Sequence, residues 1–424
     1  MSNAMASTRE CGTDTHAAKA LAVEEARQRI MADVEPVAGV EKIALRSALG
    51  RILAEDIHSP IDVPSHTNSA VDGYALAGAD LSPQGAIKLR MIGTSWAGRP
   101  FNVRVRAGEC VRIMTGAALP AGTDTVVMQE HAQTEGDAIL IGPGLQPGEN
   151  VRAAGEDLAK SQLALARGKQ ILPPELGLLA SLGMAEVPVW RRLRVAFFST
   201  GDELRSIGQP LAAGEIYDSN RYTLYGMLAR LGVDMLDLGV VRDDRDAIEQ
   251  AFLEAAANAD VIITSGGVSV GEADYVKETL ERLGAINFWQ IAMKPGRPLA
   301  YGRVRGARFF GLPGNPVSVM VTFYQFVEQA LRRMMGQGNA RPAFATFKVR
   351  CVSRLHKRPG RTEFQRAILE TDAGGELVVH ATAQQGSGIL RSMSAANCFV
   401  ILPKDSQTVE PGAFVDVQPF HGIL

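Results

Sequence analysis

Cysteine and clustered histidine are scarce in this chain. Only four cysteines occur among 424 residues, none in a CxxC pair, and the seven histidines are scattered without HExxH or HxH spacing. We therefore expect no disulfide framework, no zinc knuckle and no chemistry that needs a cluster of imidazoles. Apolar runs of roughly 18 residues, which a membrane helix needs, are missing as well. Since the chain also opens without a secretory signal pattern, we expect a cytoplasmic protein with no membrane partner.

The chain also lacks an excess of charge of either sign. Lys and Arg number 44 and Asp and Glu 46, so the formal net charge is −2. This balance argues against a nucleic-acid coat, although a local patch can still bind anions. Residues 341–366 are locally basic, with eight Lys or Arg against the single acid Glu363. They carry no RNA-binding signature and few stacking aromatics, so we expect no nucleic-acid partner.

The chain length and the proline- and glycine-rich breaks in the sequence predict several domains. At about 100–200 residues per domain, the chain holds two to four. Two prolines within 59–64 mark a boundary. Residues 61–149 have the pattern of short strands between Gly/Pro turns, which predicts a small β domain. The flanking segments 16–60 and 150–190 have helical and extended patterns, and we interpret them as one discontinuous linker domain into which the β domain is inserted.

From residue 191 to 337 short apolar strands alternate with amphipathic helices. This alternation predicts an α/β domain with a mostly parallel sheet, in which ligands bind beyond the carboxyl ends of the strands. One helix is expected to begin at Asp218 or Ser219 as its cap, and a long one to run from Pro316 to about Met335. Residues 338–424 return to a strand pattern, which predicts a small barrel or sandwich, and we adopt a C-terminal β-barrel domain.

Two glycine-containing turns follow strands of the α/β domain. In the turn 311–318, Gly314 frees the backbone, Asn315 caps and Pro316 suits the first helical turn, so the helix start offers N–H groups to a phosphate. A plain strand-to-helix turn explains the same pattern. In the loop 265–275, three glycines permit close approach to a ligand, and the loop also holds hydroxyls and a carboxylate. A flexible loop is the alternative there.

Charged residues at other strand ends suggest two kinds of ion site. Glu203 and Asp243 follow strands that we expect to be neighbours, where carboxylates share a hard cation such as Mg²⁺. Acids that complement a helix dipole are the alternative. Lys294 and Arg297 flank a Pro-Gly turn that suits an anion clamp, and a solvated basic turn is the alternative. Arg361 lies in a further turn.

Six motifs taken together resemble one family. In their order along the chain they closely resemble the molybdopterin molybdenumtransferase (MoeA) family, which is related to the gephyrin E domain, over residues about 16–424. Each motif alone is weak, but six in this order are specific. They are Asn68–Ala75, Met114–Ala117, Gly155–Asp157, Ser199–Glu203, Ser265–Gly271 and Leu312–Pro316.

The resemblance implies a transferase of molybdenum cofactor biosynthesis. Such enzymes insert molybdate into adenylylated molybdopterin, need Mg²⁺ as cofactor, release AMP and act as homodimers. Other proteins of molybdenum cofactor biosynthesis are expected partners. Two alternatives remain: the preceding adenylyltransferase, which the α/β domain alone also resembles, and a non-enzymatic scaffold, as the gephyrin E domain partly is. Turnover separates them, because an adenylyltransferase consumes ATP.

The resemblance also assigns roles to individual residues. Lys294, Arg361 and Ser387 are expected to hold the molybdate oxyanion. Gln290 departs from the family pattern, in which many members have a lysine, and we expect Arg297 or Arg361 to compensate. The expected metal ligands are Glu203, Asp243 and Asp274. The expected catalytic residues are Asp72, Thr115, Asp157, Glu203, Asp243 and Asp274. The expected substrate-binding residues are Ser265, Gly266, Gly267, Ser269, Lys294, Pro313, Gly314, Asn315, Pro316, Ser318, Arg361 and Ser387.

Overall fold

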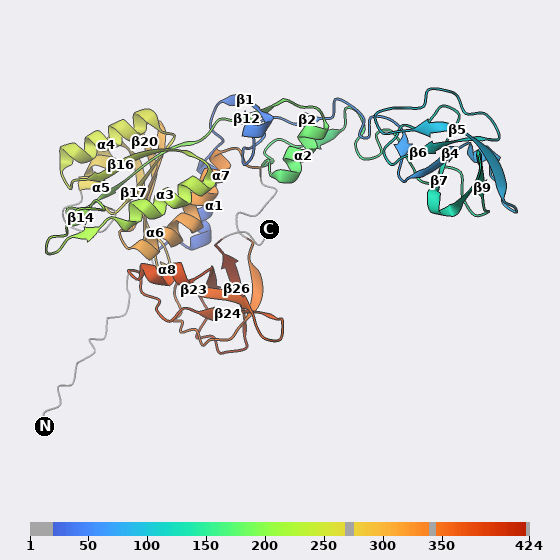
Figure 1. Cartoon of the computed structure of the whole chain (residues 1–424). Coiled ribbons are helices and arrows are strands. Elements are labelled where there is room, and N and C mark those ends of the chain that lie inside the picture. The colour runs from blue at the N-terminus through green and yellow to red at the C-terminus, as the bar shows by residue number, and fades with distance from the viewer. Residues whose placement is uncertain (1–19, 268–274, 339–344, 421–424) are drawn as a thin grey trace. The chain divides into compact units, whose positions relative to one another are not determined.

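The structure is a computed structural model that describes residues 20–267, 275–338 and 345–420 (Figure 1). It divides into two compact units, residues 1–41 with 190–424 and residues 42–189. Within the described residues, no helix has both the length and the apolar character needed to cross a membrane.

A six-stranded sheet forms the centre of the first unit. Its first four strands in spatial order run parallel, and the fifth runs antiparallel to both of its neighbours. The prediction of a mostly parallel sheet is therefore confirmed. In spatial order the strands are β16 (Asp234–Val241), β13 (Arg194–Thr200), β17 (Val261–Ser265), β21 (Ala307–Leu312), β20 (Pro298–Val304) and β18 (Gly284–Gln290).

Helices cover both faces of this sheet, because successive side chains of a strand point to opposite faces. On β13, Val195 and Phe197 belong to one hydrophobic core, whereas Ala196 and Phe198 belong to the other. The first core also contains α1 (Val23–Asp33), α3 (Ser219–Leu231), α6 (Pro316–Thr322) and α7 (Glu328–Met334), and the second contains α4 (Arg245–Asn258) and α5 (Tyr275–Leu283).

The long helix predicted from Pro316 to about Met335 is present with one irregularity. A π-helical turn, Phe323–Val327, lies between α6 and α7. All five residues of this turn are buried. Hydrophobic periodicity does not distinguish a π turn from an α turn, so the sequence predicted one uniform helix.

The C-terminal part of the first unit is a closed five-stranded β-barrel, as predicted. It closes because β23 pairs with both β24 and β25. A two-residue strand, β19 (Met293–Lys294), joins the barrel sheet by pairing in parallel with β23. The barrel strands in order are β23 (Thr362–Thr371), β24 (Leu377–Ala381), β22 (Phe347–Cys351), β26 (Phe414–Pro419) and β25 (Cys398–Leu402).

The second unit contains a six-stranded sheet and a smaller helical and extended part. The smaller part includes α2 (Pro173–Ser181) and a pairing of β2 (Ile57–His58) with β11 (Leu163–Leu165). The smaller part is therefore built from chain segments that precede and follow the sheet in the sequence. The strands of the sheet in order are β7 (Thr125–Met128), β4 (Gly73–Leu76), β6 (Glu109–Ile113), β5 (Ile87–Ser95), β9 (Ala138–Ile141) and β8 (Ala132–Glu135).

The helical signal read over residues 16–60 is too broad. Within the described part of this segment, the only α-helix is α1, and β1 (Val40–Ala44), a short 3₁₀ turn (Leu45–Ser47) and β2 follow it. β1 pairs with β12 (Glu186–Trp190), which lies far away in sequence. Strand formation there depends on that distant partner, so a local pattern does not reveal it.

Candidate functional site

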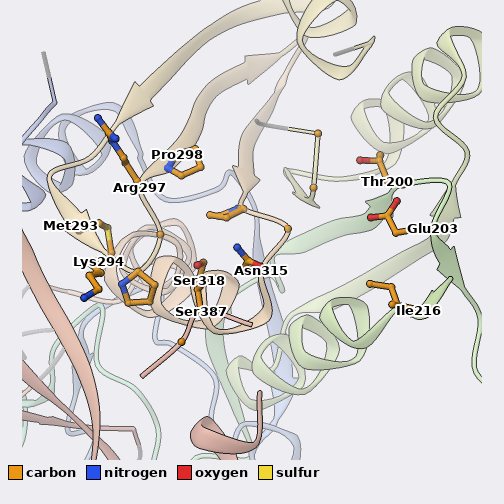
Figure 2. Close-up of a pocket in the computed structure, with 18 of the residues that line it drawn as sticks. Thr200, Glu203, Ile216, Met293, Lys294, Arg297, Pro298, Asn315, Ser318 and Ser387 are labelled. Carbon is orange, nitrogen blue, oxygen red and sulfur yellow. The ribbon is translucent and has the colours of Figure 1, made fainter. Parts of the chain in front are cut away.

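A pocket of about 840 Å³ lies within the first unit, where loops after the central strands meet the barrel (Figure 2). Its walls come from three sources: the carboxyl-end loops of the sheet, the turn after β19, and two loops of the barrel. The predicted site residues that line it are Glu203, Asp243, Gly266, Gly267, Lys294, Pro313, Gly314, Asn315, Ser318, Arg361 and Ser387.

One side of the pocket is acidic. Glu203 follows β13 and Asp243 follows β16, and these strands are parallel neighbours whose last pair is Thr200 with Val241. Burial raises the pKa of the Asp243 carboxyl, and the negative charges of Asp202 and Glu203 raise that pKa further. A bound cation would relieve this repulsion. The donor set therefore fits a hard cation with oxygen ligands.

The predicted cation ligands are only partly within the described residues. Glu203 and Asp243 line the pocket, whereas Asp274 lies outside the described part of the chain. Within that part, no group of three or more His, Cys, Asp or Glu side chains has an arrangement that could hold a metal ion. Mg²⁺ thus stays a prediction, supported by a pair of carboxylates.

The opposite side of the pocket is basic. Lys294 ends β19, Arg297 follows it in the Pro-Gly turn, and Arg361 immediately precedes β23 of the barrel. The turn requires glycine at position 296, which has a φ of +92°, and an added Cβ would lie 2.6 Å from Thr322 Oγ1. The anion clamp predicted from Lys294 and Arg297 therefore shares one pocket with Arg361.

A loop of the barrel completes this basic side. Gln385, Gly386 and Ser387 line the pocket. The carbonyl of Ser387 accepts a hydrogen bond of 3.1 Å from the backbone N–H of Val317, at the start of α6. Ser318 on the same helix also lines the pocket. The attachment of this loop to α6 is a tertiary contact, which a local sequence pattern does not show.

The glycine loop after β17 packs closely against other protein atoms, whereas the sequence predicted close approach to a ligand, which stays a prediction. Gly266 and Gly267 have φ values of +91° and +65°. A Cβ on Gly266 would lie 2.7 Å from the carbonyl oxygen of Thr200, and one on Gly267 would lie 2.5 Å from Val276 Cγ2. Glycine is therefore required at both positions. Ser269, which was predicted to add a hydroxyl, lies outside the described residues.

The turn before α6 differs from its prediction in two respects. Asn315 occupies the N-cap position, but its side chain makes no capping hydrogen bond. Gly314 is not among the residues with positive φ, so a free backbone is not the reason for glycine there. An added Cβ would approach only Gly266 Cα, at 4.0 Å. Asn315 and Gly314 therefore line the pocket.

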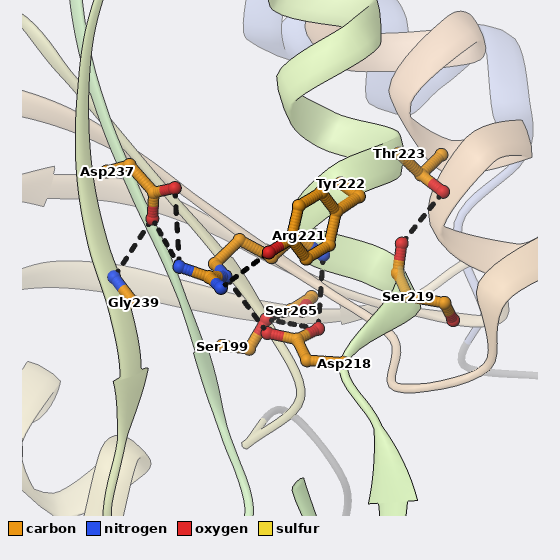
Figure 3. A network of polar contacts seen from close by, with 9 residues as sticks. All are labelled: Ser199, Asp218, Ser219, Arg221, Tyr222, Thr223, Asp237, Gly239 and Ser265. Atoms are coloured by element: carbon orange, nitrogen blue, oxygen red, sulfur yellow. Dashed lines mark hydrogen bonds and ion pairs between the residues drawn. The ribbon is translucent and has the colours of Figure 1, made fainter. Parts of the chain in front are cut away.

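A buried polar network holds the ends of β13 and β17 against α3 (Figure 3). Asp218 is the N-cap of α3, as predicted, and accepts a hydrogen bond of 3.1 Å from the N–H of Arg221. It also accepts one of 3.1 Å from Ser199 Oγ, which lies 2.8 Å from Ser265 Oγ. Ser265 and Pro316 line a second pocket of about 390 Å³ that shares Thr200, Glu203 and Asn315 with the larger one.

Three predicted catalytic residues, Asp72, Thr115 and Asp157, belong to the second unit and are described within it. The backbone N–H and the hydroxyl of Thr115 each donate a hydrogen bond of 2.7 Å to Asp72 Oδ1. These bonds lower the pKa of the Asp72 carboxyl, and the backbone bond has the largest effect. Asp157 donates its backbone N–H to the carbonyl of Val63, at 3.0 Å.

Comparison with known proteins gives three family matches along the chain. The family described as MoeA N-terminal region (domain I and II) matches residues 21–183. A probable molybdopterin binding domain matches residues 196–333, and the MoeA C-terminal region (domain IV) matches residues 348–420.

Individual proteins agree with these matches. A molybdopterin molybdenumtransferase of Haemophilus influenzae is 42% identical over 407 residues, which cover 95% of this chain and 100% of that protein. A gephyrin of Dictyostelium discoideum is 33% identical, over 89% of this chain and 59% of that protein. The crystal structure of a MoeA protein from Pyrococcus horikoshii OT3 is similar with a TM-score of 0.83 and 30% identity, over 95% of this chain and 100% of that one.

Proposed function

The chain belongs to the molybdopterin molybdenumtransferase family, whose members are transferases of molybdenum cofactor biosynthesis. From this premise we propose that the protein inserts molybdate into adenylylated molybdopterin, with Mg²⁺-dependent release of AMP. One observation carries the proposal: a single pocket has carboxylates on one side and basic side chains on the other. The substrates require both, because an oxyanion needs cationic donors and a phosphate-bound cation needs carboxylates.

The basic side would bind the oxyanion. Lys294 and Arg361 supply charge-assisted N–H donors, which bind oxyanions more strongly than neutral donors do. Ser387 adds a hydroxyl from the barrel loop. Arg361 forms no ion pair with a described residue, so its charge is available to a substrate. Gln290 supplies no charge, and Arg297 lines the pocket as a further cation.

The acidic side would hold the cation. Glu203 and Asp243 would be ligands of Mg²⁺, together with Asp274 from the sequence. When bound, Mg²⁺ supplies charge that offsets the charge developing on the phosphate leaving group. The carboxylates orient that end of the substrate, and the loop of Gly266 and Gly267 lets the backbone approach it. Catalysis would then rest mainly on positioning and electrostatics.

The direct test is turnover by the purified protein. Adenylylated molybdopterin and molybdate are supplied with and without Mg²⁺, and released AMP and active cofactor are measured. We expect AMP and cofactor to form together and only with Mg²⁺. Consumption of ATP with unadenylylated molybdopterin would instead identify an adenylyltransferase. Absence of turnover under both conditions would favour a scaffold.

We further propose a cytoplasmic homodimer that works with other proteins of molybdenum cofactor biosynthesis, in which Asp72, Thr115 and Asp157 act as catalytic residues. Light scattering measures the mass in solution, and a monomer at micromolar concentration would contradict the dimer. Replacing Asp72 with Asn or Asp157 with Asn is expected to lower the rate of AMP release by at least about tenfold. Unchanged rates would remove these residues from the mechanism.

A further inference from the structure

A buried arginine of the barrel lies directly behind the pocket wall. Arg366 on β23 is only 1% exposed. Its Nε donates to Ser392 Oγ at 3.1 Å, and its Nη2 donates to the carbonyls of Gln384 at 3.2 Å and Gly386 at 3.1 Å. Among the described residues, no carboxylate bonds to it or pairs with it. Burial lowers the pKa of its guanidinium to about 10, so it remains charged at neutral pH.

Such a residue is unfavourable for stability alone. Burying a charged group without a counter-ion is costly, and an apolar side chain of similar volume would fill the same space at lower cost. Composition does not reveal this burial, because Arg366 ends a locally basic stretch of the chain. A role outside packing is therefore needed to explain it.

Arg366 holds the loop that lines the basic side of the pocket. Besides its guanidinium bonds, its backbone N–H donates to Gln385 Oε1 at 2.9 Å, and its carbonyl accepts from Gln385 Nε2 at 2.9 Å. The far end of the loop is held by the bond from Val317 N–H to the carbonyl of Ser387, at 3.1 Å. The loop is thus fixed at one end by Arg366 and at the other by α6.

The direction of these bonds determines which groups of the loop face the pocket. In a trans peptide the carbonyl and the next N–H point in opposite directions. Because the carbonyls of Gln384 and Gly386 point to Arg366, the N–H groups of Gln385 and Ser387 point away from it. Both residues line the pocket, and neither N–H bonds to a described residue. Backbone N–H groups that have no protein partner and face a pocket can bind an anion.

We propose that Arg366 is a positioning residue for the oxyanion end of the pocket. By holding two carbonyls it directs the N–H groups of Gln385 and Ser387 at the bound anion, and its uncompensated charge adds to the attraction. The inference deepens the proposed function and rests on it for the identity of the anion, molybdate. The positioning itself is a property of the protein without ligand.

Two measurements on the full-length protein test the proposal. Hydrogen exchange of the Val317 amide, which bonds to the loop, is followed without ligand, and molybdate binding is followed by calorimetry. Arg366→Met is expected to speed exchange and to weaken molybdate binding, each by about tenfold, because the variant loses the hydrogen bonds of the guanidinium. Arg366→Lys keeps the charge without the forked donors. It is expected to exchange as fast as Arg366→Met but to bind molybdate more tightly.

Arg350→Met is the matched control. Arg350 is also a barrel arginine, but it forms ion pairs with Asp372 and Glu376 at the surface. Its loss removes the same charge and is expected to change both readouts by less than about twofold. Arg366→Met with unaltered exchange and binding would overturn the proposal.

Two further outcomes are also decisive. If Arg366→Met fails to fold, Ser392→Ala decides instead, because it removes only the acceptor of the Arg366 Nε hydrogen bond. Ser392→Ala is expected to weaken molybdate binding by about threefold. No change in either exchange or binding would overturn the proposal. If the unaltered protein binds no molybdate, the proposed function fails, while exchange at Val317 still decides the positioning role.

Discussion

Lys294 and Glu363 face each other where β19 pairs with β23, and their side chains form an ion pair with 3.6 Å between Nζ and Oε2. Glu363 is only 5% exposed, whereas the Lys294 side chain is about half exposed. The same carboxylate oxygen accepts a 3.1 Å hydrogen bond from Gln365 Nε2. A buried negative charge therefore lies directly behind a lysine that we propose to bind molybdate, and it opposes the binding of a dianion.

Glu363→Gln is accordingly expected to strengthen molybdate binding by about three- to tenfold at low ionic strength, because it removes this repulsion and keeps an acceptor for Gln365. The effect should shrink as salt is added. Calorimetric titration at two salt concentrations measures both. Glu376→Gln, an exposed acid of the same barrel, is the control. Weaker binding would show instead that Glu363 orients Lys294.

Gly266→Ala is expected to destabilise the protein by about 1–3 kcal/mol, because the new Cβ would meet the Thr200 carbonyl oxygen in a left-handed backbone conformation. The midpoint and slope of urea unfolding measure this. Gly314→Ala is the matched control from the same pocket, since its Cβ would approach only Gly266 Cα, at 4.0 Å, and its φ is not positive. Equal destabilisation by both substitutions would contradict this account of Gly266.

Elements with a strong local pattern were predictable from the sequence. The alternation of strands and helices and the helix capped by Asp218 were predicted, because cap residue and apolar face agree locally. The carboxylates after β13 and β16 were expected to meet because parallel neighbours end at one edge. The structure places both in one pocket.

What failed depends on contacts between distant segments. β1 was missed because its partner β12 lies far along the chain. Arg366 and Glu363 were counted only as members of a locally basic stretch, because composition does not show that both side chains of β23 are buried. Asn315 was expected to cap α6 through its side chain, and it does not. Local pattern predicted element type and candidate loops, but not burial of charge.

Thr115→Val is expected to raise the pKa of Asp72 without restoring its ordinary value, because the hydroxyl donor is lost and the stronger backbone donor remains. Carboxyl titration by NMR measures it, and Thr115→Ser should leave the pKa unchanged. A depressed folded-state pKa contributes stability above the unfolded-state pKa of about 3.9 and loses it as the pH falls through the folded value. The variant should therefore lose less stability below about pH 4.

Asp243→Asn is expected to stabilise the protein without Mg²⁺ and to remove the effect of Mg²⁺. The folded-state pKa of Asp243 is raised by burial and by Asp202 and Glu203. A raised pKa favours the folded state below the unfolded value of about 3.9, and that advantage is lost as the pH rises through the folded value. Because Asp243 is largely exposed, the gain in unfolding free energy at pH 7 should be about 0.5 kcal/mol or less and vanish near pH 4.

Thermal unfolding at both pH values, with and without Mg²⁺, measures the effects of Asp243→Asn. Asp246→Asn, in the first turn of α4, is the control and should keep the response to Mg²⁺. If Mg²⁺ stabilises Asp243→Asn as much as it stabilises the unaltered protein, Asp243 does not ligate the cation. The raised pKa would then reflect only the crowding of three carboxylates. If Asp243→Asn is more stable at pH 7 and no longer responds to Mg²⁺, one cause explains both results. The cation then relieves the repulsion between Asp243 and the carboxylates of Asp202 and Glu203.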